Sequence, residues 1–275
     1  MKRILASLML VIILMSVGCT QAKFENKNNS STATSSETVN TQNDTYESTT
    51  EKTSEATVES TEVVTERIVD KNKKMIAFTF DDGPCPNTNK ILDIFNKYNG
   101  KATFFVVGNN LYRKDTLKRI VDEGHEIGSH TWSHSDLANL NSKGIKNDFI
   151  KMKDKIYEYT GYEIELLRPP YGSFDKTVKN TCKKLDIPII MWDVDTLDWK
   201  SRKKKSIISV IRKKAKNGSI VLCHDLYDST VEAIEKIVPE YIKKGYQLVT
   251  VSELLKADTD KIEPGLCYFS RHEAY

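Results

Sequence analysis

The stretch that decides the fold is Met75-Ile76-Ala77-Phe78-Thr79-Phe80-Asp81-Asp82-Gly83-Pro84. Six residues typical of a strand run directly into two adjacent carboxylates, and Gly83-Pro84 then turns the chain. Side chains alternate along a strand, so Phe78 and Phe80 share one face and the neighbours of Ile76 share the other. Apolar residues on both faces predict a strand that is covered on both sides.

The two acids at the end of this strand favour a metal site. Asp81 and Asp82 repel each other, and both lose hydration if the site is enclosed. A bound cation makes such a pair tolerable, because its charge favours ionised carboxylates. Asp-Asp-Gly-Pro is also good turn chemistry, so these residues alone leave a simple turn open.

The N-terminus, residues 1–19, has the pattern of an export signal. Lys2 and Arg3 precede an apolar run from Ile4 to Val17, which is shorter than the ~20 residues that cross a bilayer as a helix. Ser16-Val17-Gly18-Cys19 resembles a bacterial lipobox, so Cys19 is expected to carry lipid and become the mature N-terminus. Leucine is commonest where Ser16 stands, and ordinary signal-peptidase cleavage or an uncleaved anchor stay open.

Residues 20–70 have the composition of a disordered tether. The segment has no Gly or Pro, 19 of its 51 residues are Ser or Thr, and it carries 4 basic and 10 acidic side chains. Such a stretch cannot bury enough apolar surface to offset the entropy of ordering. We therefore expect it to link a lipid anchor to the folded part of the chain.

Without the signal and the tether, the remaining residues carry a formal charge of +7. This balance favours an anionic surface or polymer as a neighbour. Export from the cytoplasm disfavours nucleic acid, and no protein partner is evident. Basic runs such as Lys203-Lys204-Lys205 and Arg212-Lys213-Lys214 lie in expected helices and fit solvated faces beside a polyanionic wall.

The cysteines beyond Cys19 have no metal-like spacing. They are Cys85, Cys182, Cys223 and Cys267. Export permits disulfides, but their connectivity cannot be deduced from sequence. Two of them, Cys182 and Cys223, lie inside apolar patterns and fit buried thiols. The third, Cys85, stands beside the acids, where contact with a metal or with another thiol is open.

Strand-like and helix-like segments alternate from residue 75 onward. We expect strands at 75–80, 102–107, 126–129, 166–168, 187–194, 220–223 and 246–251. Six helical segments lie between these strands. Five of them are expected at 117–121 (after Asp115 as the cap), 145–159, 175–185, 207–211 and 229–244. Strict alternation predicts a parallel sheet with helices outside, as a barrel or an open doubly wound sheet. Residues 258–275 show no periodicity and stay unassigned.

The reactive residues follow the expected strands. They are Asp81, Asp82, His130, Arg168, Asp195, Asp198 and His224. The carboxyl ends of parallel strands meet at one rim, where barrel enzymes place their chemistry. No Gly-rich phosphate loop follows the first strand, which disfavours a dinucleotide-binding fold.

His130-Thr131-Trp132-Ser133-His134 places two imidazoles four residues apart, close enough on one helical turn to share a metal ion. With one carboxylate they form a set that leaves positions open for water and substrate, as a catalytic zinc needs. A His-x-x-x-His pair alone is more often structural, but here the acid pair converges on it. Since Thr131 replaces the glutamate of zinc-protease helices, one of the paired acids is free to be the general base.

Five motifs together are similar to those of the polysaccharide deacetylases, the NodB-homology enzymes of carbohydrate esterase family 4. They are Thr79-Phe80-Asp81-Asp82-Gly83-Pro84, His130-x-x-x-His134, Arg168-Pro169-Pro170-Tyr171-Gly172, Asp195-x-x-Asp198-Trp199 and Leu222-x-His224. The resemblance covers residues 72–256 in the family's order. It implies an α/β fold, a distorted, incomplete (β/α) barrel with about seven parallel strands, and a catalytic domain at 71–257.

The resemblance implies a role for each matching residue. Asp82, His130 and His134 would bind a divalent metal, usually Zn²⁺, with Co²⁺, Mn²⁺ or Ni²⁺ as alternatives. Asp81 would be the general base toward the attacking water, and Arg168 would orient Asp81 and favour its charged form.

The remaining roles concern the substrate. His224 would protonate the leaving sugar amine, with Asp195 tuning it. The backbone N–H of Tyr171 would join the metal in stabilising the oxyanion, and Trp199 and Leu222 would shape an apolar pocket for the acetyl methyl.

These roles imply a metal-dependent N-deacetylase acting on N-acetylglucosamine units of peptidoglycan or a related cell-surface polysaccharide. The protein would be a lipoprotein on the outer face of the bacterial cytoplasmic membrane, facing the cell wall. Two alternatives stay open: an O-acetyl esterase acting on xylan or an exopolysaccharide, and a catalytically silent wall-binding lipoprotein. Tyr171 resembles the glucosamine-type members of the family more than the muramic-type members.

Overall fold

The computed structural model describes residues 69–259 and 261–275. The expected export signal at 1–19, the lipidated Cys19 and nearly all of the expected tether at 20–70 lie outside the described residues. Among the residues that are described, no helix is both long enough and apolar enough to cross a membrane.

Strands and helices alternate along most of the described chain. The strands are β1 (Lys74–Asp81), β2 (Thr103–Val106), β3 (Glu126–Ser129), β4 (Ile189–Ile190), β5 (Val194–Asp195), β6 (Ile220–His224), β7 (Tyr246–Leu248), β8 (Cys267–Ser270) and β9 (Glu273–Ala274). The α-helices are α1 (Pro86–Lys97), α2 (Lys114–Asp122), α3 (Ser142–Thr160), α4 (Lys176–Lys184), α5 (Asp198–Ser201), α6 (Lys204–Lys214), α7 (Asp228–Lys243) and α8 (Val251–Leu255). Short 3₁₀ turns are η1 (Gly108–Asn110), η2 (Leu137–Asn139) and η3 (Pro170–Gly172).

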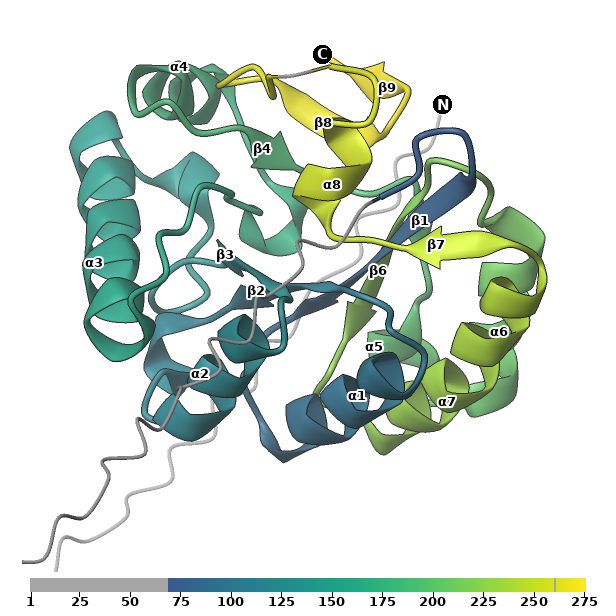
Figure 1. The fold of residues 1–275 in the computed structure, drawn as a ribbon. Coiled ribbons are helices and arrows are strands. Elements are labelled where there is room, and N and C mark those ends of the chain that lie inside the picture. The colour runs from purple at the N-terminus through teal and green to yellow at the C-terminus, as the bar shows by residue number, and fades with distance from the viewer. Residues whose placement is uncertain (1–68, 260) are drawn as a thin grey trace, which may run out of the picture. The chain divides into compact units, whose positions relative to one another are not determined.

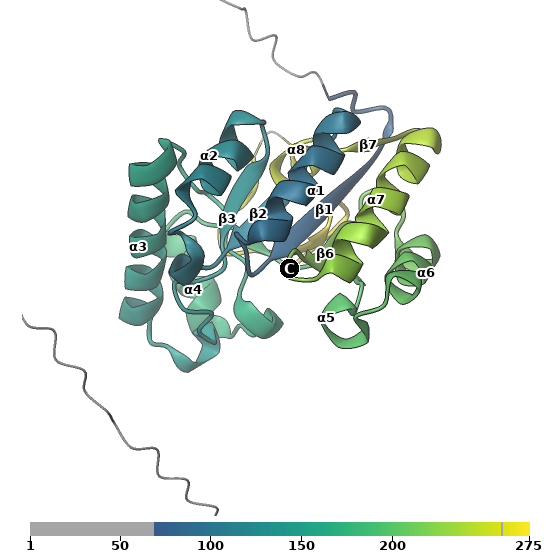
Figure 2. The ribbon, with the colours of Figure 1, turned by 90° about the horizontal axis from the view of Figure 1, so that it is seen from below.

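The central sheet is parallel and has the order β3-β2-β1-β6-β5, with β7 paired to the start of β1. Single parallel bridges through Leu167 join Ser129 of β3 to Ile189 of β4, which continues the curve of the sheet. Seen from below, helices α3, α2, α1, α7 and α6 follow one another around the strands (Figure 2). The expected distorted, incomplete barrel with parallel strands is confirmed (Figure 1).

Two expected strands are shorter in the structure. The strand expected at 166–168 is reduced to the bridges at Leu167, since Pro169 and Pro188 have no N–H to continue a ladder. The strand expected at 187–194 is split into β4 and β5. Arg168 donates to the carbonyl groups of Ile190, the last residue of β4, and of Met191, the residue after it, so these carbonyls are not free for strand pairing.

The end of the chain also differs from the expectation. The strand expected at 246–251 stops at Leu248, because Thr250 forms a capping box with Glu253 and starts α8. The unassigned residues 258–275 form β8 and β9, and β8 pairs in parallel with β4. Ser270 then bridges to Ser219 before β6, so the tail spans part of the gap in the barrel. The folded domain therefore extends to Tyr275, beyond the expected boundary at 257.

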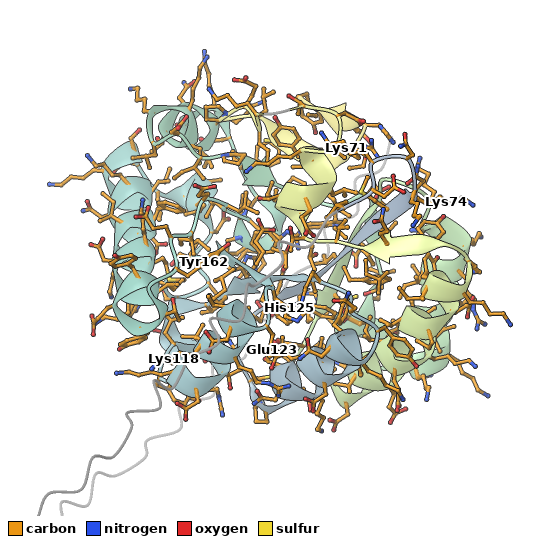
Figure 3. The ribbon with its side chains drawn as sticks, in the orientation of Figure 1. Lys71, Lys74, Lys118, Glu123, His125 and Tyr162 are labelled. Atoms are coloured by element: carbon orange, nitrogen blue, oxygen red, sulfur yellow. The ribbon has the colours of Figure 1, made fainter. Side chains whose placement is uncertain are left out.

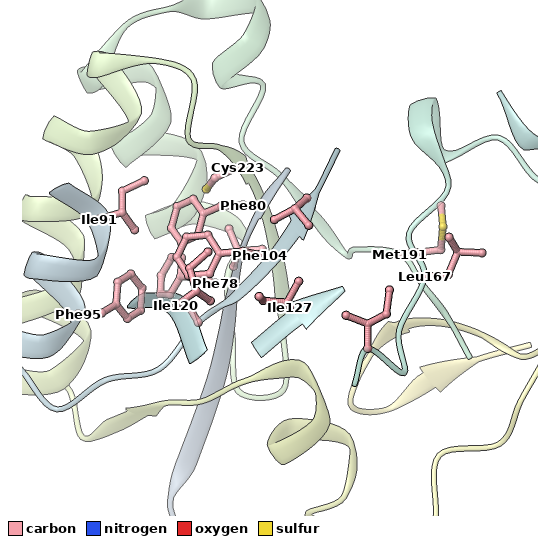
Figure 4. Packing of buried hydrophobic residues seen from close by; sticks show 14 of the residues in the cluster. Phe78, Phe80, Ile91, Phe95, Phe104, Ile120, Ile127, Leu167, Met191 and Cys223 are labelled. Atoms are coloured by element: carbon pink, nitrogen blue, oxygen red, sulfur yellow. The ribbon is translucent and has the colours of Figure 1, made fainter. Parts of the chain in front are cut away.

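The core confirms that the first strand is covered on both faces. Phe78 and Phe80 pack on the same side, where Phe80 stacks on Phe104 at 5.3 Å and meets the edge of Phe95 at 6.0 Å between ring centroids (Figure 4). Met75 and Ala77 face a second buried cluster with residues of α8. This double burial fixes the direction of β1 and so the position of the acids at its end.

His125 is a buried histidine of the core (Figure 3). Its ring lies edge-on to Phe95 and Phe104, at 6.0 and 5.7 Å between centroids, and its Nδ1 accepts a hydrogen bond from the N–H of Ala102. It precedes β3, whereas His130 follows β3. His125 therefore belongs to the opposite end of the strand from the reactive rim.

Candidate active site

Residues from separate strands meet at the carboxyl ends of the sheet. Asp81 ends β1, His224 ends β6, and the parallel register places these two residues opposite each other. His130 follows β3, and its N–H donates to the carbonyl of Val106 at the end of β2. Arg168 follows the bridge at Leu167. The convergence expected from the sequence is therefore present in the structure.

Asp82, His130 and His134 form the candidate metal site. Their ligand atoms all lie within 4.8 Å of one another. Asp82 Oδ1 lies 3.6 Å from His130 Nε2 and 3.3 Å from His134 Nε2. This oxygen is buried without a properly oriented hydrogen-bond donor among the described residues. A buried carboxylate oxygen that faces two imidazole nitrogens fits a divalent cation between them.

The protonation states of Asp82 and His130 also favour the binding of a cation. Burial acts to raise the pKa of Asp82, but the close approach of His134 and the positive charges of the nearby imidazoles outweigh it, so the pKa lies below its ordinary value. Burial lowers the pKa of His130, and the attraction of Asp81 and Asp82 does not overcome it. An ionised carboxylate and a neutral imidazole are the forms that bind a metal.

The second nitrogen of each imidazole has a partner. His130 Nδ1 lies 2.8 Å from the carbonyl oxygen of Arg168, and His134 Nδ1 lies 3.1 Å from the hydroxyl of Tyr171. Contacts of this kind fix the orientation of the ring and leave Nε2 for the metal.

The two histidines do not share a helical turn, contrary to the expectation. They lie on a loop after β3, where Thr131 and His134 have positive φ of 65° and 56°. The loop is held by contacts with other segments: the N–H of Gly108 donates to the carbonyl of Thr131, and Asp148 of α3 accepts from the N–H of Trp132. The rings still come together, with 5.0 Å between centroids.

Asp81 lies beside the metal site and is held by Arg168. The side chain of Asp81 is 2 % exposed and that of Arg168 is fully buried. Asp81 Oδ1 accepts a hydrogen bond of 2.8 Å from the guanidinium, while Oδ2 lies 3.8 Å from His130 Nε2. Burial lowers the pKa of Arg168, and the negative charge of Asp81 opposes this shift. One carboxylate oxygen is thus fixed and the other faces the metal site.

His224 is paired with Asp198, which corrects the expected pairing with Asp195. His224 Nδ1 lies 2.8 Å from Asp198 Oδ1, and Asp198 Oδ2 accepts from the N–H of His224 and the hydroxyl of Thr230. Asp195 instead accepts from the N–H of Leu197 in the turn that follows β5. As a result of this turn, Asp198, the second acid of the Asp-x-x-Asp motif, is the fully buried one.

The pairing sets the charge of His224. Burial opposes the charged imidazole, but the hydrogen bond and the negative charge of Asp198 outweigh it and raise the pKa of His224 to about 9. His224 is therefore protonated at neutral pH and has Nε2–H free to donate.

Replacing Asp198 by asparagine is expected to shift the alkaline limb of the pH–rate profile downward. The hydrolysis that the family resemblance implies needs protonated His224, so in the unmodified protein we expect it to fall as pH rises through about 9. Without the carboxylate, the pKa of His224 falls toward the ordinary imidazole value of about 6.5, so the loss begins at lower pH. The measurement is the rate of hydrolysis between pH 5 and pH 10. Asp195→Asn is the matched control, and an equal shift in that variant would contradict the assignment of Asp198.

The three residues expected to contact substrate surround the same rim. Tyr171 is 71 % exposed with a positive φ of 62°, and Trp199 is 48 % exposed at the start of α5. Leu222 is buried in β6, two residues before His224. Their roles toward a substrate stay predictions.

Asp225 is a buried acid at the rim that the sequence argument missed. Burial raises the pKa of Asp225 to about 7, although the hydrogen bond from the hydroxyl of Thr88 opposes the shift. A Cβ on Gly83 would collide with Asp225 Oδ2, so any larger residue at this position would displace the Asp225 carboxylate. The signal was present in the sequence, as an acid directly after His224.

The open question about Cys85 has a structural answer within the described residues. The thiol of Cys85 donates to the backbone carbonyl of Asp225 at 3.2 Å. Cys85 does not belong to the candidate metal site formed by Asp82, His130 and His134. All four described cysteines are free thiols, and Cys182, Cys223 and Cys267 are buried as the apolar pattern predicts for the first two.

Comparison with known proteins agrees with this geometry. The polysaccharide deacetylase family model matches residues 68–190. PdaC, the peptidoglycan-N-acetylmuramic acid deacetylase of Bacillus subtilis, is 43% identical over 191 residues, which are 69% of this chain and 40% of PdaC. A peptidoglycan-N-acetylglucosamine deacetylase of Bacillus cereus is 41% identical over 195 residues, which are 68% of this chain and 91% of that protein.

A solved structure gives the same result. The solved structure of the peptidoglycan deacetylase PdaC from Bacillus subtilis matches with a TM-score of 0.66 at 41% identity, over 70% of this chain and 95% of that one. The chain spans 40% and 43% of the length of the first curated relatives it matches, and nearly all of the Bacillus cereus protein. With this coverage and identity, the chain belongs to the polysaccharide deacetylase family.

Proposed function

We propose that this protein is a metal-dependent hydrolase that removes N-acetyl groups from N-acetylglucosamine units of peptidoglycan or a related cell-surface polysaccharide. One observation carries the proposal: an acid and a histidine, each held by a buried partner of opposite charge, lie on the rim that holds the candidate metal site. Asp81 is held by a buried guanidinium, and His224 is kept protonated by a buried carboxylate. The names of both curated relatives, which are peptidoglycan deacetylases, support the substrate class.

Amide hydrolysis needs an activated water, a stabilised oxyanion and a proton for the amine that leaves. A bound divalent ion supplies positive charge toward the oxyanion, and two imidazoles with one carboxylate suit zinc. Asp81 accepts the proton of the attacking water through Oδ2, because Arg168 occupies Oδ1.

The leaving amine receives its proton from His224. The bond between Nδ1 and Asp198 leaves Nε2–H as the donor, and the pKa of about 9 keeps it protonated at neutral pH. The base and the acid are therefore separated by their surroundings. The backbone N–H of Tyr171 would add to oxyanion stabilisation, while Trp199 and Leu222 would enclose the acetyl methyl.

The same proposal includes the place of action. The export pattern with Cys19 would leave the protein as a lipoprotein on the outer face of the cytoplasmic membrane. The Ser/Thr-rich segment after Cys19 supports this, because its composition suits a tether between an anchor and a wall-facing domain.

The test is release of acetate from N-acetylated peptidoglycan by the full-length protein, followed by identification of the deacetylated sugar. We expect glucosamine to appear, activity to vanish with a chelator and zinc to restore it. If muramic acid appeared instead, the substrate would be N-acetylmuramic acid, as in the name of PdaC. Release from acetylxylan but not from peptidoglycan would favour the esterase alternative. No release from either, by folded protein with metal bound, would favour the silent wall-binding alternative.

A further inference from the structure

A cationic groove is lined by residues of α6 and by Lys236 of α7. These two helices are neighbours on the outer face of the barrel (Figure 1). The volume of the groove is about 840 Å³, and five of its lining side chains are basic: Lys204, Lys205, Arg212, Lys213 and Lys236. The other lining residues are Ile208 and Ser209, and no acidic side chain lines it. We call this feature the α6–α7 groove.

The walls of the α6–α7 groove are fixed relative to each other. The hydroxyl of Tyr241 in α7 donates to the carbonyl of Ile211 in α6 at 3.1 Å. Arg212 forms a two-point contact with Glu240 across the helices, with a shortest distance of 2.6 Å. The shape of the groove is therefore set by fixed contacts between the two helices.

Three of its charges are not neutralised. Arg212 is paired with Glu240, and Lys204 lies 3.8 Å from Glu232 at the edge. Lys205, Lys213 and Lys236 form no ion pair within residues 69–259 and 261–275. A concavity lined by charges of one sign focuses the electrostatic field and raises the local concentration of anions.

The type of side chain indicates the type of anion. The unpaired groups are ammonium groups, which act as point charges and suit phosphate, whereas the guanidinium that would grip a carboxylate at two points is already paired. No aromatic side chain lines the groove, so it has neither a stacking platform for bases nor a group that would enter a bilayer.

We propose that the α6–α7 groove binds a linear phosphodiester polymer of the cell surface. Both of its helices begin at the reactive rim: α6 follows the short helix that carries Trp199, and α7 begins four residues after His224. A helix of 11 residues such as α6 is about 16 Å long, so a bound polymer would run away from the rim beside the glycan substrate. Binding would keep the domain on an anionic wall while it acts on the neighbouring glycan. The choice of a cell-surface polymer rests on the proposed export.

The test is binding of full-length, zinc-loaded protein to immobilised poly(glycerol phosphate) at increasing salt. We expect the triple variant Lys205→Gln, Lys213→Gln, Lys236→Gln to lose about tenfold or more in affinity. The slope of log affinity against log salt should fall by about 2, as for three lost phosphate contacts.

A matched triple variant removes the same charge elsewhere. Lys118→Gln, Lys143→Gln and Lys146→Gln lie on α2 and α3, and Lys118 is labelled in Figure 3. Equal weakening in both triples, or no weakening in either, would overturn the groove as the site. Stronger binding to phosphatidylglycerol vesicles, lost in the groove triple, would overturn the polymer in favour of lipid.

Acetate release from chito-oligosaccharides separates this proposal from the proposed function. These substrates carry no phosphate, so both triples should release acetate at the unmodified rate. Polymer binding by a protein that releases no acetate would contradict the deacetylase proposal and leave the groove in place.

Discussion

Replacing Asp81 by asparagine is expected to reduce acetate release by about 10²–10⁴-fold while leaving the proposed metal site able to bind zinc. The amide has nearly the shape of the carboxylate, and its oxygen still accepts from Arg168. It has no lone pair basic enough to take the proton of the attacking water. The candidate metal ligands Asp82, His130 and His134 are unchanged. The measurements are kcat/KM on chito-oligosaccharides and the zinc content of the purified variant.

Two further variants make this result specific. Asp82→Asn should lose both activity and zinc, because it changes a candidate ligand. Asp225→Asn tests the other buried acid of the rim, whose pKa of about 7 would also suit a base. Since Asp225 Oδ2 is occupied by the hydroxyl of Thr88, we expect this variant to keep most of the activity. A greater loss with Asp225→Asn than with Asp81→Asn would mean that the base is misassigned.

The parts of the fold that the sequence predicted are those set by local patterns. Phe78 and Phe80 share a face because alternation along a strand is a property of the backbone, and the core confirms it. The end of α3 at Gly161 was equally predictable, since this glycine has the left-handed conformation, with φ of 71°, that closes a helix. The gathering of reactive residues followed from parallel topology alone.

The parts that it did not predict depend on contacts between distant segments. Asp195 and Asp198 are equivalent as sequence, and only the turn at Leu197, with φ of 52°, decides which of them meets His224. The loop between His130 and His134 has the spacing of a helical turn, but its contacts with α3 and η1 impose another conformation.

The C-terminal residues were missed for the same reason. Cys267–Ser270 is too short to show a strand pattern, and its conformation comes from pairing with β4. A two-residue strand such as β4 cannot be recognised from composition, so neither partner predicts the other. Pairing across this distance is decided by the curvature of the whole sheet, which brings β8 beside β4.

Replacing Arg168 by methionine is expected to lower the free energy of unfolding by about 3–5 kcal/mol. The guanidinium is fully buried and donates to four acceptors: the hydroxyl of Thr79, the carboxylate of Asp81 and the carbonyls of Ile190 and Met191. It also lies 4.1 Å above the ring of Phe105. Methionine fills similar volume but leaves a buried carboxylate without its counter-charge and two carbonyls without donors. Urea unfolding with the metal removed measures the change without a contribution from metal binding.

The double variant Arg168→Met, Asp81→Asn identifies the origin of this loss. If the cost arises from the uncompensated charge of Asp81, then adding Asp81→Asn to Arg168→Met should recover part of the stability, although each change alone destabilises the protein. Such coupling is what a double-mutant cycle detects between residues in contact. Additive losses would instead place the cost in the carbonyls of Ile190 and Met191. Arg168 would then act mainly by closing the gap between β4 and β5, and its contact with Asp81 would contribute little to folding.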